Sequence, residues 1–438
     1  MQNHLTNLRN LGVIYMTKQK NVRIGIIGLG PRAETLLASI FLMLEEHHLE
    51  VTAICDLRDD CIEKIQSIFD KHGVARPRAY HNYHEMLVAD DVDAILAPTS
   101  WNSHLKIACD AMKAGKNVGI EVGGASSIEE LWQLVHAAES TGVNCMMLEN
   151  CCYGRNELMV LNMVRQGLFG ELIYCEAGYE HGIGKELAEA YSKNGERCLH
   201  NIHRNGELYP THGLGPIAKI LNINRGNRFM TVSSHATKSR GFAIAMEQFA
   251  GKPGMVFNEG DIVTTVIHCA NGENITLTHG VSLPRPYSRN CRVQGTKGIW
   301  LENAKSIYID GISPRYEILD DAGNPYERFE WDAIDKFYDK YDHPIWAEYR
   351  DKQIGGHGGI DALALMAFFD AVRNNIPAPI DIYDCAAWMS ITCLSEQSIS
   401  LGGMPVPVPD FTNGKWVSPR PLQPSRWSLD NVYPECFK

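Results

Sequence analysis

Between residues 22 and 149, short apolar runs alternate with segments in which apolar residues recur at helical spacing. The first run, Val22 to Gly30, ends in glycines and leads into a periodic segment through Leu36 and Ile40. Strands that alternate with helices are typical of a doubly wound parallel sheet, which binds ligands at the carboxyl ends of its strands. We therefore predict an α/β domain over residues 21–150, with strands at 22–30, 50–55, 93–97, 117–121 and 144–149 and helices at 104–115 and 127–141.

From Leu172 onward, the pattern changes to an alternation of polar and apolar residues. Such alternation is typical of an antiparallel sheet with one solvated face. We expect strands at 171–181, 228–236, 260–268 and 273–282, a mobile surface loop at 182–198, and a helix after residue 361. The sequence thus predicts a C-terminal α+β, substrate-binding domain over 151–402 with a large, mostly antiparallel open sheet. An N-terminal arm (1–20) precedes the first domain, and a Pro-rich tail (403–438) in extended form follows the second.

Composition narrows the class of protein. The 438 residues are 45% hydrophobic and 21% charged, which is typical of a globular chain of about two domains. The net charge of -11 argues against nucleic-acid binding, which needs a basic surface. No apolar run is long enough to cross a membrane, and the first residues lack the apolar core of a secretory signal. The 13 cysteines show no zinc-ligand spacing, so we predict a cytoplasmic protein with reduced thiols and no metal.

The end of the first strand carries a candidate cofactor motif. Gly28, Gly30 and Ala33 form G-x-G-x-x-A between a strand and a helix. Gly28 permits the tight turn, and Gly30 lets the backbone approach a pyrophosphate at the helix N-terminus. Asp56 ends the second strand, where a carboxylate binds the ribose hydroxyls of NAD and repels the 2′-phosphate of NADP. A helix cap is the alternative role for Asp56. We predict NAD as the cofactor.

Other polar side chains follow the later strands. Trp101, His104, Glu121 and Asn150 all fall at predicted strand exits, and Glu149 lies beside them. Because the carboxyl ends of parallel strands share one edge of the sheet, these side chains are expected at the ligand site.

Residues 203–216 gather chemistry in the second half. Tyr209 and His212 stand three residues apart, so if Pro210 opens a helix, both side chains share one face. Such a pair can transfer protons to and from a sugar hydroxyl, although the same residues could merely cap a helix. A second loop, Gly355 to Asp361, holds His357 among glycines and is either a ligand loop or an interdomain turn.

The W-x-x-H segment at a strand exit, followed by a strand ending in Glu121, resembles the Gfo/Idh/MocA family of nicotinamide-dependent oxidoreductases with a Rossmann domain. Dehydrogenases of that family typically carry Glu-Lys-Pro here, with a catalytic lysine, whereas this chain has Glu121-Val122-Gly123. The absence of an ammonium group argues against simple alcohol dehydrogenation.

Within that family, four stretches resemble glycoside hydrolase family 109, whose members are NAD-dependent α-N-acetylgalactosaminidases. The stretches are 209–216, 222–228, 283–287 and 356–361. The resemblance implies NAD at Pro31, Arg32, Asp56, Trp101, Asn102, Ser103, His104, Glu121, Val122 and Asn150. It implies the sugar at Tyr179, Arg197, Tyr209, Pro210, Thr211, His212 and Tyr287. Family members usually carry Trp-Arg-x-Arg-His where this chain has Glu196-Arg-Cys-Leu-His200, so contacts to the substrate are expected to differ.

The resemblance also implies a mechanism: hydride removal at C3, loss of the C2 proton, elimination at C1, addition of water and return of the hydride. We assign His212 to the C3 hydroxyl, Tyr179 or Tyr209 to the C2 proton and Arg197 to the oxyanion. The partner is then a small glycoside or sugar, with the chain as a homo-oligomer. Two alternatives stay open: a sugar or cyclitol dehydrogenase that releases NADH, and a non-catalytic NAD-binding protein.

Overall fold

A computed structural model describes residues 21–191, 195–352, 354–419 and 424–437. The arm predicted over 1–20 lies outside the described residues. The N-terminal part is a six-stranded sheet in the order β3-β2-β1-β4-β5-β6, and every neighbouring pair is parallel. This arrangement confirms the predicted doubly wound sheet, with the strand order reversing between β1 and β4. Its elements are β1 Val22–Ile27, α1 Pro31–Met43, β2 Leu49–Cys55, α2 Asp59–Lys71, β3 Arg78–Tyr80, α3 Tyr83–Leu87, β4 Ala94–Ala97, α4 His104–Lys113, β5 Asn117–Ile120, α5 Ile128–Thr141 and β6 Cys145–Met147.

The second sheet has nine strands in the order β16-β13-β12-β11-β7-β10-β9-β8-β17. Its pairs are antiparallel except β10 with β7, which confirms a large, mostly antiparallel sheet. Along β9, buried and exposed residues alternate, so one face of this strand is open to solvent. The strands are β7 Leu172–Glu180, β8 Phe229–Ala236, β9 Val263–Cys269, β10 Asn274–Gly280, β11 Arg292–Gly295, β12 Gly298–Leu301, β13 Ser306–Ile309, β16 Asp332–Ala333 and β17 Val406–Pro407, with a separate hairpin of β14 Arg315–Leu319 and β15 Pro325–Phe329.

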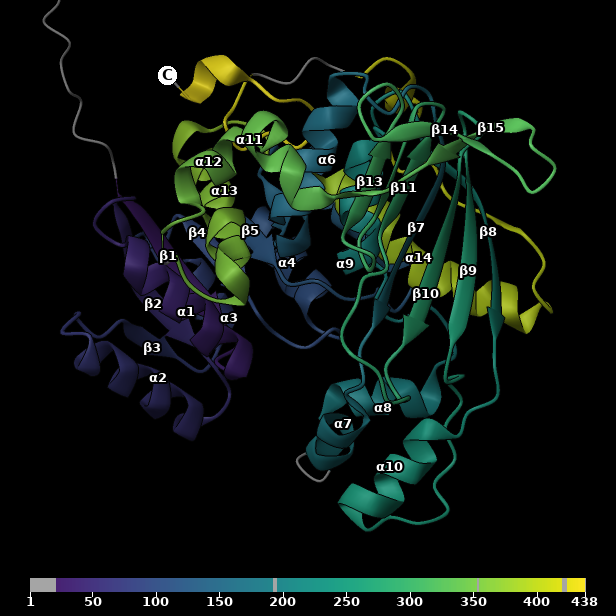
Figure 1. Ribbon diagram of the computed structural model, residues 1–438. Coiled ribbons are helices and arrows are strands. Elements are labelled where there is room, and N and C mark those ends of the chain that lie inside the picture. Colours follow the sequence, from purple (N-terminus) through teal and green to yellow (C-terminus); the bar gives the residue numbers. More distant parts are fainter. Residues whose placement is uncertain (1–20, 192–194, 353, 420–423, 438) are drawn as a thin grey trace, which may run out of the picture.

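Helices cover the second sheet and connect it to the first. Figure 1 shows α14 running behind the large sheet, while α7, α8 and α10 gather beyond one end of it. Helix α13 packs against α1 and β1, so a late segment of the chain returns to the parallel sheet. No helix among the described ranges is long and apolar enough to span a membrane. These helices are η1 Asn150–Tyr153, α6 Arg155–Arg165, α7 Gly184–Tyr191, α8 Glu196–His203, α9 Thr211–Ile220, α10 Gly241–Ala250, η2 Ile334–Phe337, α11 Tyr338–Tyr341, α12 Pro344–Tyr349, η3 His357–Gly359, α13 Ile360–Asn374, α14 Ile382–Ser400, η4 Lys415–Val417 and η5 Pro434–Phe437.

Two sequence predictions in this half were wrong. The mobile loop expected at 182–198 contains α7 and the start of α8. Leu187 and Ala188 of α7 are buried against Phe242 of α10, and this packing fixes the helix where composition suggested a loop. The C-terminal tail was predicted to lie in extended form on the surface, but part of it is built into the fold. It adds β17 to the sheet beside β8, and the side chain of Trp427 is buried in the core.

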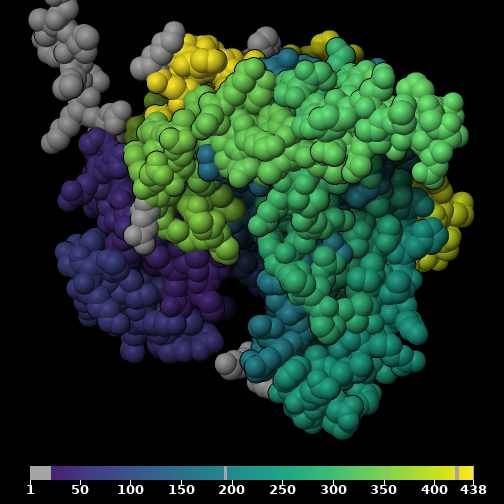
Figure 2. Space-filling model, viewed as in Figure 1, coloured from purple at the N-terminus to yellow at the C-terminus, as the bar shows by residue number. Residues whose placement is uncertain are grey.

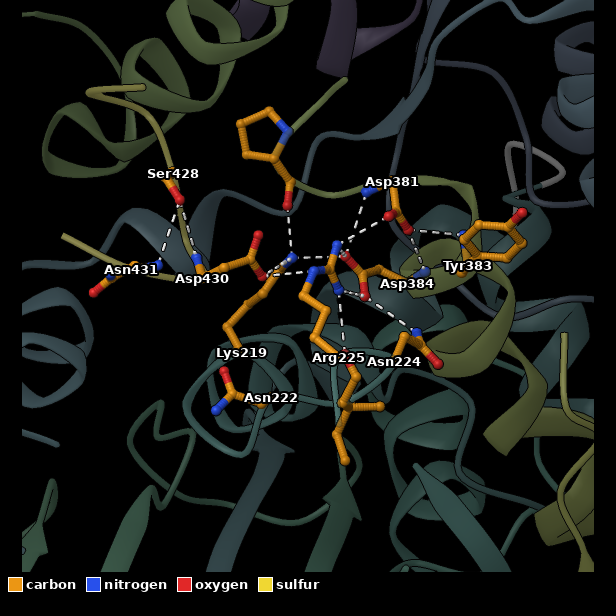
Figure 3. Close-up of polar contacts among 12 residues, drawn as sticks. Lys219, Asn222, Asn224, Arg225, Asp381, Tyr383, Asp384, Ser428, Asp430 and Asn431 are labelled. Atoms are coloured by element: carbon orange, nitrogen blue, oxygen red, sulfur yellow. Dashed lines mark hydrogen bonds and ion pairs between the residues drawn. The ribbon is translucent and has the colours of Figure 1, made fainter. Parts of the chain in front are cut away.

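A buried charge network holds the C-terminal end of α9. Lys219 donates to Asp384 at 2.7 Å and to the carbonyl of Pro379 at 2.6 Å, and it lies 3.4 Å from Asp430. Arg225 contacts the same two aspartates, each at 2.7 Å. Figure 3 shows how these side chains converge from α9, α14 and the C-terminal tail. Because all three segments meet here, the network sets where α9 lies.

Candidate functional site

A cavity of about 360 Å³ lies between the exits of β4 and β5 and the helices α8 and α9. Figure 2 shows the surface hollowed between the N-terminal part and the teal helices of the second half. The predicted residues that line this cavity are Arg32, Trp101, Glu121, Val122, Asn150, Tyr179, Arg197, Tyr209 and His212. Arg32 and His212, which are 180 positions apart in the sequence, thus line the same cavity. A larger cavity, about 630 Å³, lies beside the β14–β15 hairpin and contains none of the predicted residues.

The turn between β1 and α1 fits a dinucleotide. Gly28 has φ +89°, and a side chain there would meet Thr99 at 2.6 Å. At Gly30 an added Cβ would meet nothing within 4 Å, so the helix N-terminus is open to a phosphate group. Pro31, which is exposed, forms the first residue of α1. Asp56, at the exit of β2, accepts the Leu29 N–H at 2.7 Å, which fixes its carboxylate beside the turn.

Arg32, the second residue of α1, is the centre of a charged cluster. It donates to Glu121 at 2.8 Å and makes two parallel hydrogen bonds to Asp361, at 3.0 and 3.1 Å. Asp361 also accepts from Asn150 at 2.6 Å and contacts His357 Nδ1 at 2.7 Å. Burial raises the pKa of Asp361, but the Arg32 guanidinium lowers it by more than burial raises it. The pKa of Asp361 is therefore below its usual range. The cluster joins α13 to the exits of the parallel strands.

The exit of β4 brings an indole into the cavity. Gly123, with φ +144°, lies so close to Trp101 that a Cβ there would meet the indole at 2.5 Å. Val122 lines the cavity at the position where dehydrogenases of the resembled family carry lysine. Among the other predicted residues, Asn102 donates its N–H to Glu196 at 3.2 Å, and Ser103 precedes α4. His104 is fully buried outside the cavity lining, and burial lowers its pKa to about 4.

Three ring-bearing side chains, those of Tyr179, Tyr209 and His212, cluster in the cavity lining. Tyr179 stands at the end of β7, with its ring 4.5 Å from that of Tyr209. The Tyr209 hydroxyl lies 3.5 Å from His212 Nε2, and His212 Nδ1 lies 2.7 Å from Glu149 Oε1. Pro210 directly precedes the first residue of α9, so the predicted helix begins one residue later than expected. Tyr209 therefore lies outside the helix and shares no helix face with His212, although the two side chains are in contact.

The pKa shifts indicate that His212 and Glu149 form an ion pair, whereas the phenol of Tyr209 is neutral. Burial lowers the pKa of His212, but the neighbouring Cys151 thiol and Glu149 carboxylate outweigh it and hold this pKa well above its ordinary value. Burial raises the pKa of Glu149, and His212 more than reverses that effect. Burial raises the pKa of Tyr209 to about 12, so its hydroxyl keeps its proton at neutral pH. Glu149 therefore orients His212 as a carboxylate partner would in a catalytic triad.

Arg197, in the first turn of α8, is held by aromatic rings rather than by a carboxylate. Its guanidinium carbon lies 4.6 Å from the ring centre of Tyr209 and 5.1 Å from that of Tyr179. Its Nη2 is buried and has no hydrogen-bond partner among the described residues. A half-buried cation with one buried, unpaired donor atom beside a cavity is suited to an oxygen acceptor on a ligand.

The remaining predicted residues lie around this core. Pro210 and Thr211 are buried beneath the cavity, and Tyr287 is half-exposed with its ring 5.9 Å from Tyr179. Four residues that were not assigned to the site in the prediction belong to it in the structure, although His357 and Glu149 had been noted in the sequence. They are Glu149, which contacts His212; Asp361, which binds Arg32; and Glu196 and His357, which line the cavity. The sequence signal for Glu149 was its place at a strand exit, which was noted without a role.

The chain matches two family descriptions. Residues 22–149 match "Oxidoreductase family, NAD-binding Rossmann fold", and residues 153–418 match "Glycosyl hydrolase 109, C-terminal domain". The chain belongs to the glycosyl hydrolase 109 family. It is 39% identical to an alpha-N-acetylgalactosaminidase of Tannerella forsythia, over 91% of this chain and 88% of that protein. It is 38% identical to one of Shewanella oneidensis, with coverage of 92% and 88%. The predicted family, and with it the class of NAD-dependent glycosidase, is confirmed.

Solved structures show the same fold at low identity. An NAD-binding oxidoreductase from Klebsiella pneumoniae gives a TM-score of 0.66 at 16% identity, covering 89% of this chain and 99% of that one. Levoglucosan dehydrogenase in complex with NADH and levoglucosan gives 0.65 at 16% identity, covering 89% and 100%. At this identity the likeness supports the fold, a parallel nucleotide-binding sheet joined to a large open sheet.

Proposed function

We propose that this protein hydrolyses hexosaminides of the α-N-acetylgalactosaminide type by transient oxidation at C3, using NAD rather than NADP. The observation that carries the proposal is the content of the cavity. It holds two phenols, an imidazole and an unpaired guanidinium, and Val122 stands where a dehydrogenase lysine would lie. Names of relatives at 38–39% identity support the sugar.

The residues present fit a bound dinucleotide. Gly28 permits the tight turn, Gly30 leaves room for the pyrophosphate, and Asp56 is oriented toward the same turn by the Leu29 N–H. Arg58, two residues after Asp56, is paired with Asp60. When bound, NAD⁺ would supply a hydride acceptor at C3 of the sugar and later return that hydride.

The side chains then have distinct tasks. Above its raised pKa, His212 loses its Nε2 proton and keeps its Nδ1 proton directed at Glu149, so the lone pair of Nε2 can take the proton of the C3 hydroxyl. Oxidation at C3 makes the C2 proton acidic, and Tyr179 or Tyr209 lies within the same cluster of rings to remove it. Tyr209 would do so as a phenolate, a form that the neighbouring His212 and Arg197 favour against the effect of burial. Arg197 directs its unpaired donor at the oxyanion that develops. Loss of the C1 substituent and addition of water complete the hydrolysis.

The test is a panel of aryl α- and β-hexosaminides and hexosides, given to the NAD-loaded protein while aglycone release and absorbance of reduced nicotinamide are followed. The proposal predicts aglycone release without net reduced nicotinamide, strongest for an α-N-acetylgalactosaminide. Accumulation of reduced nicotinamide with an intact glycosidic bond would make the protein a dehydrogenase instead.

The role of Tyr209 has its own test. Tyr209→Phe removes the hydroxyl and keeps the ring against Arg197 and Tyr179. If Tyr209 is the C2 base, exchange of the C2 proton with solvent should cease. Near-normal exchange would assign this step to Tyr179. Tyr383→Phe, at an exposed hydroxyl paired with Glu139, is a matched control and should retain full exchange.

A further inference from the structure

Three side chains with metal-binding atoms lie close together beside the cavity, which one of them lines: Glu149, Cys151 and His212. One such atom from each lies within 4.8 Å of the others. Glu149 and Cys151 are almost completely buried, and His212 lines the cavity. The turn of η1 brings the thiol to the carboxylate, since the Cys151 N–H donates to Glu149 Oε1 at 3.1 Å. No step proposed for the sugar uses this thiol.

We propose that Glu149, Cys151 and His212 bind Zn²⁺ or another thiophilic divalent cation, and that binding blocks the enzyme. Thiolate, imidazole and carboxylate are the ligands that zinc takes in proteins. Three protein ligands leave a fourth position, which a water molecule can fill. The proton leaves the thiol when the metal binds.

The distances show what the metal would displace. His212 Nδ1 and Glu149 Oε1 are 2.7 Å apart, the length of a hydrogen bond with a proton between them. Two ligands of one tetrahedral zinc ion stand roughly 3.3 Å apart, given Zn–N and Zn–O bonds of about 2.0–2.1 Å. The ion therefore takes the place of the shared proton after a small widening of the pair. It holds the imidazole by Nδ1 and occupies the space beside it, so His212 can no longer serve the sugar. This inhibitory consequence rests on the proposed function, whereas metal binding itself does not.

Cobalt titration tests binding independently of activity. Co²⁺ added to the metal-free, NAD-loaded protein should produce a thiolate-to-cobalt charge-transfer band that saturates at one equivalent. Cys151→Ala and Cys151→Ser should abolish the band. Cys152→Ala is the matched control, because Cys152 is equally buried but outside the cluster, and it should keep the band. Absence of the band in the unaltered protein, or its persistence in Cys151→Ser, would overturn the proposal.

Zinc inhibition tests the consequence. Stoichiometric Zn²⁺ should abolish aglycone release, and a chelator should restore it. In Cys151→Ala and Cys151→Ser the thiolate ligand is lost. Loss of a residue that only orients a ligand weakens metal binding by about 10- to 100-fold, so these variants should need about 100-fold more zinc, or more, for inhibition. A protein that forms the cobalt band but stays fully active with zinc would overturn the inhibitory part. If the metal-free protein shows no glycosidase activity, the proposed function fails while the cobalt band still decides the metal site.

Discussion

A group of buried, charged side chains lies at each end of α9, and the two groups differ in how completely their polar atoms are paired. At the C-terminal end, every N–H of Lys219 and Arg225 has an acceptor, and these acceptors come from α14, the tail and the adjacent backbone. At the N-terminal end, the pairing is incomplete. Glu149 Oε2 and Arg197 Nη2 are buried with no partner in the described part of the chain, and His212 Nε2 has only a 3.5 Å contact with Tyr209.

This difference separates a structural network from a functional site. Buried polar groups are costly when unpaired, so a network that pairs every N–H of both cations, and leaves only Asp430 Oδ2 without a partner among the described residues, indicates a role in the fold. Unpaired donors and acceptors around a 360 Å³ cavity indicate groups kept for a ligand. The same helix thus fixes its position at one end and presents its chemistry at the other.

The largest expected effect is at the N-terminal end. His212→Asn should lower kcat/KM by about 10²- to 10⁴-fold, because it removes the proposed acid–base group. The thermal midpoint should also fall, because Glu149 is left buried without its cationic partner, so kcat/KM is measured well below that midpoint. A matched control is His268→Asn, at an exposed histidine paired with Asn274, which should keep its activity. A His212→Asn protein with near-normal kcat/KM would contradict the role of His212.

At the other end, the expected loss is in stability. Lys219→Met should lower the free energy of unfolding by about 3–5 kcal/mol, because it leaves the Asp384 carboxylate buried without one of its two cationic partners. Urea denaturation measures this loss. Lys415→Met removes an exposed lysine paired with Glu139 and should change stability little. Equal effects of the two substitutions would show that burial of the network does not matter.

A smaller effect should follow from Glu149→Gln, which keeps the shape of the side chain but removes its charge. Glu149 raises the pKa of His212, so without that charge this pKa falls. Because His212 must be unprotonated to accept a proton, kcat/KM rises as pH rises through its pKa, and the acid limb should move to lower pH. Activity on the plateau should fall by about 10- to 100-fold, as for loss of a partner that orients a histidine. An acid limb at unchanged pH would remove Glu149 from this role.

The sequence predicted the features that depend on local spacing. The glycine turn, Asp56 and the strand exits at Trp101 and Glu121 follow from strand and helix periodicity, and the structure places them around one edge of the sheet. Tyr209 and His212 are three residues apart, so their contact was also a local property.

Contacts between distant segments could not be predicted in this way. Glu149 and His212 are 63 residues apart, and Arg32 and Asp361 are 329 residues apart, so no periodicity relates them. Helix α7 was missed because its buried residues are few and glycines surround it, and its contact with α10 decides its conformation. Packing between distant segments thus determined the helical conformation of α7 and the partners of Glu149 and Arg32, which the local sequence pattern did not specify.

The central claim is that a glycosidic bond is cleaved by oxidation at C3 followed by loss of the C2 proton. The most direct measurement is hydrolysis of an aryl α-N-acetylgalactosaminide in D₂O by the NAD-loaded protein, with deuterium at C2 of the released sugar determined by NMR. The account predicts deuterium at C2 with no net reduced nicotinamide. Hydrolysis that leaves only protium at C2 would contradict it.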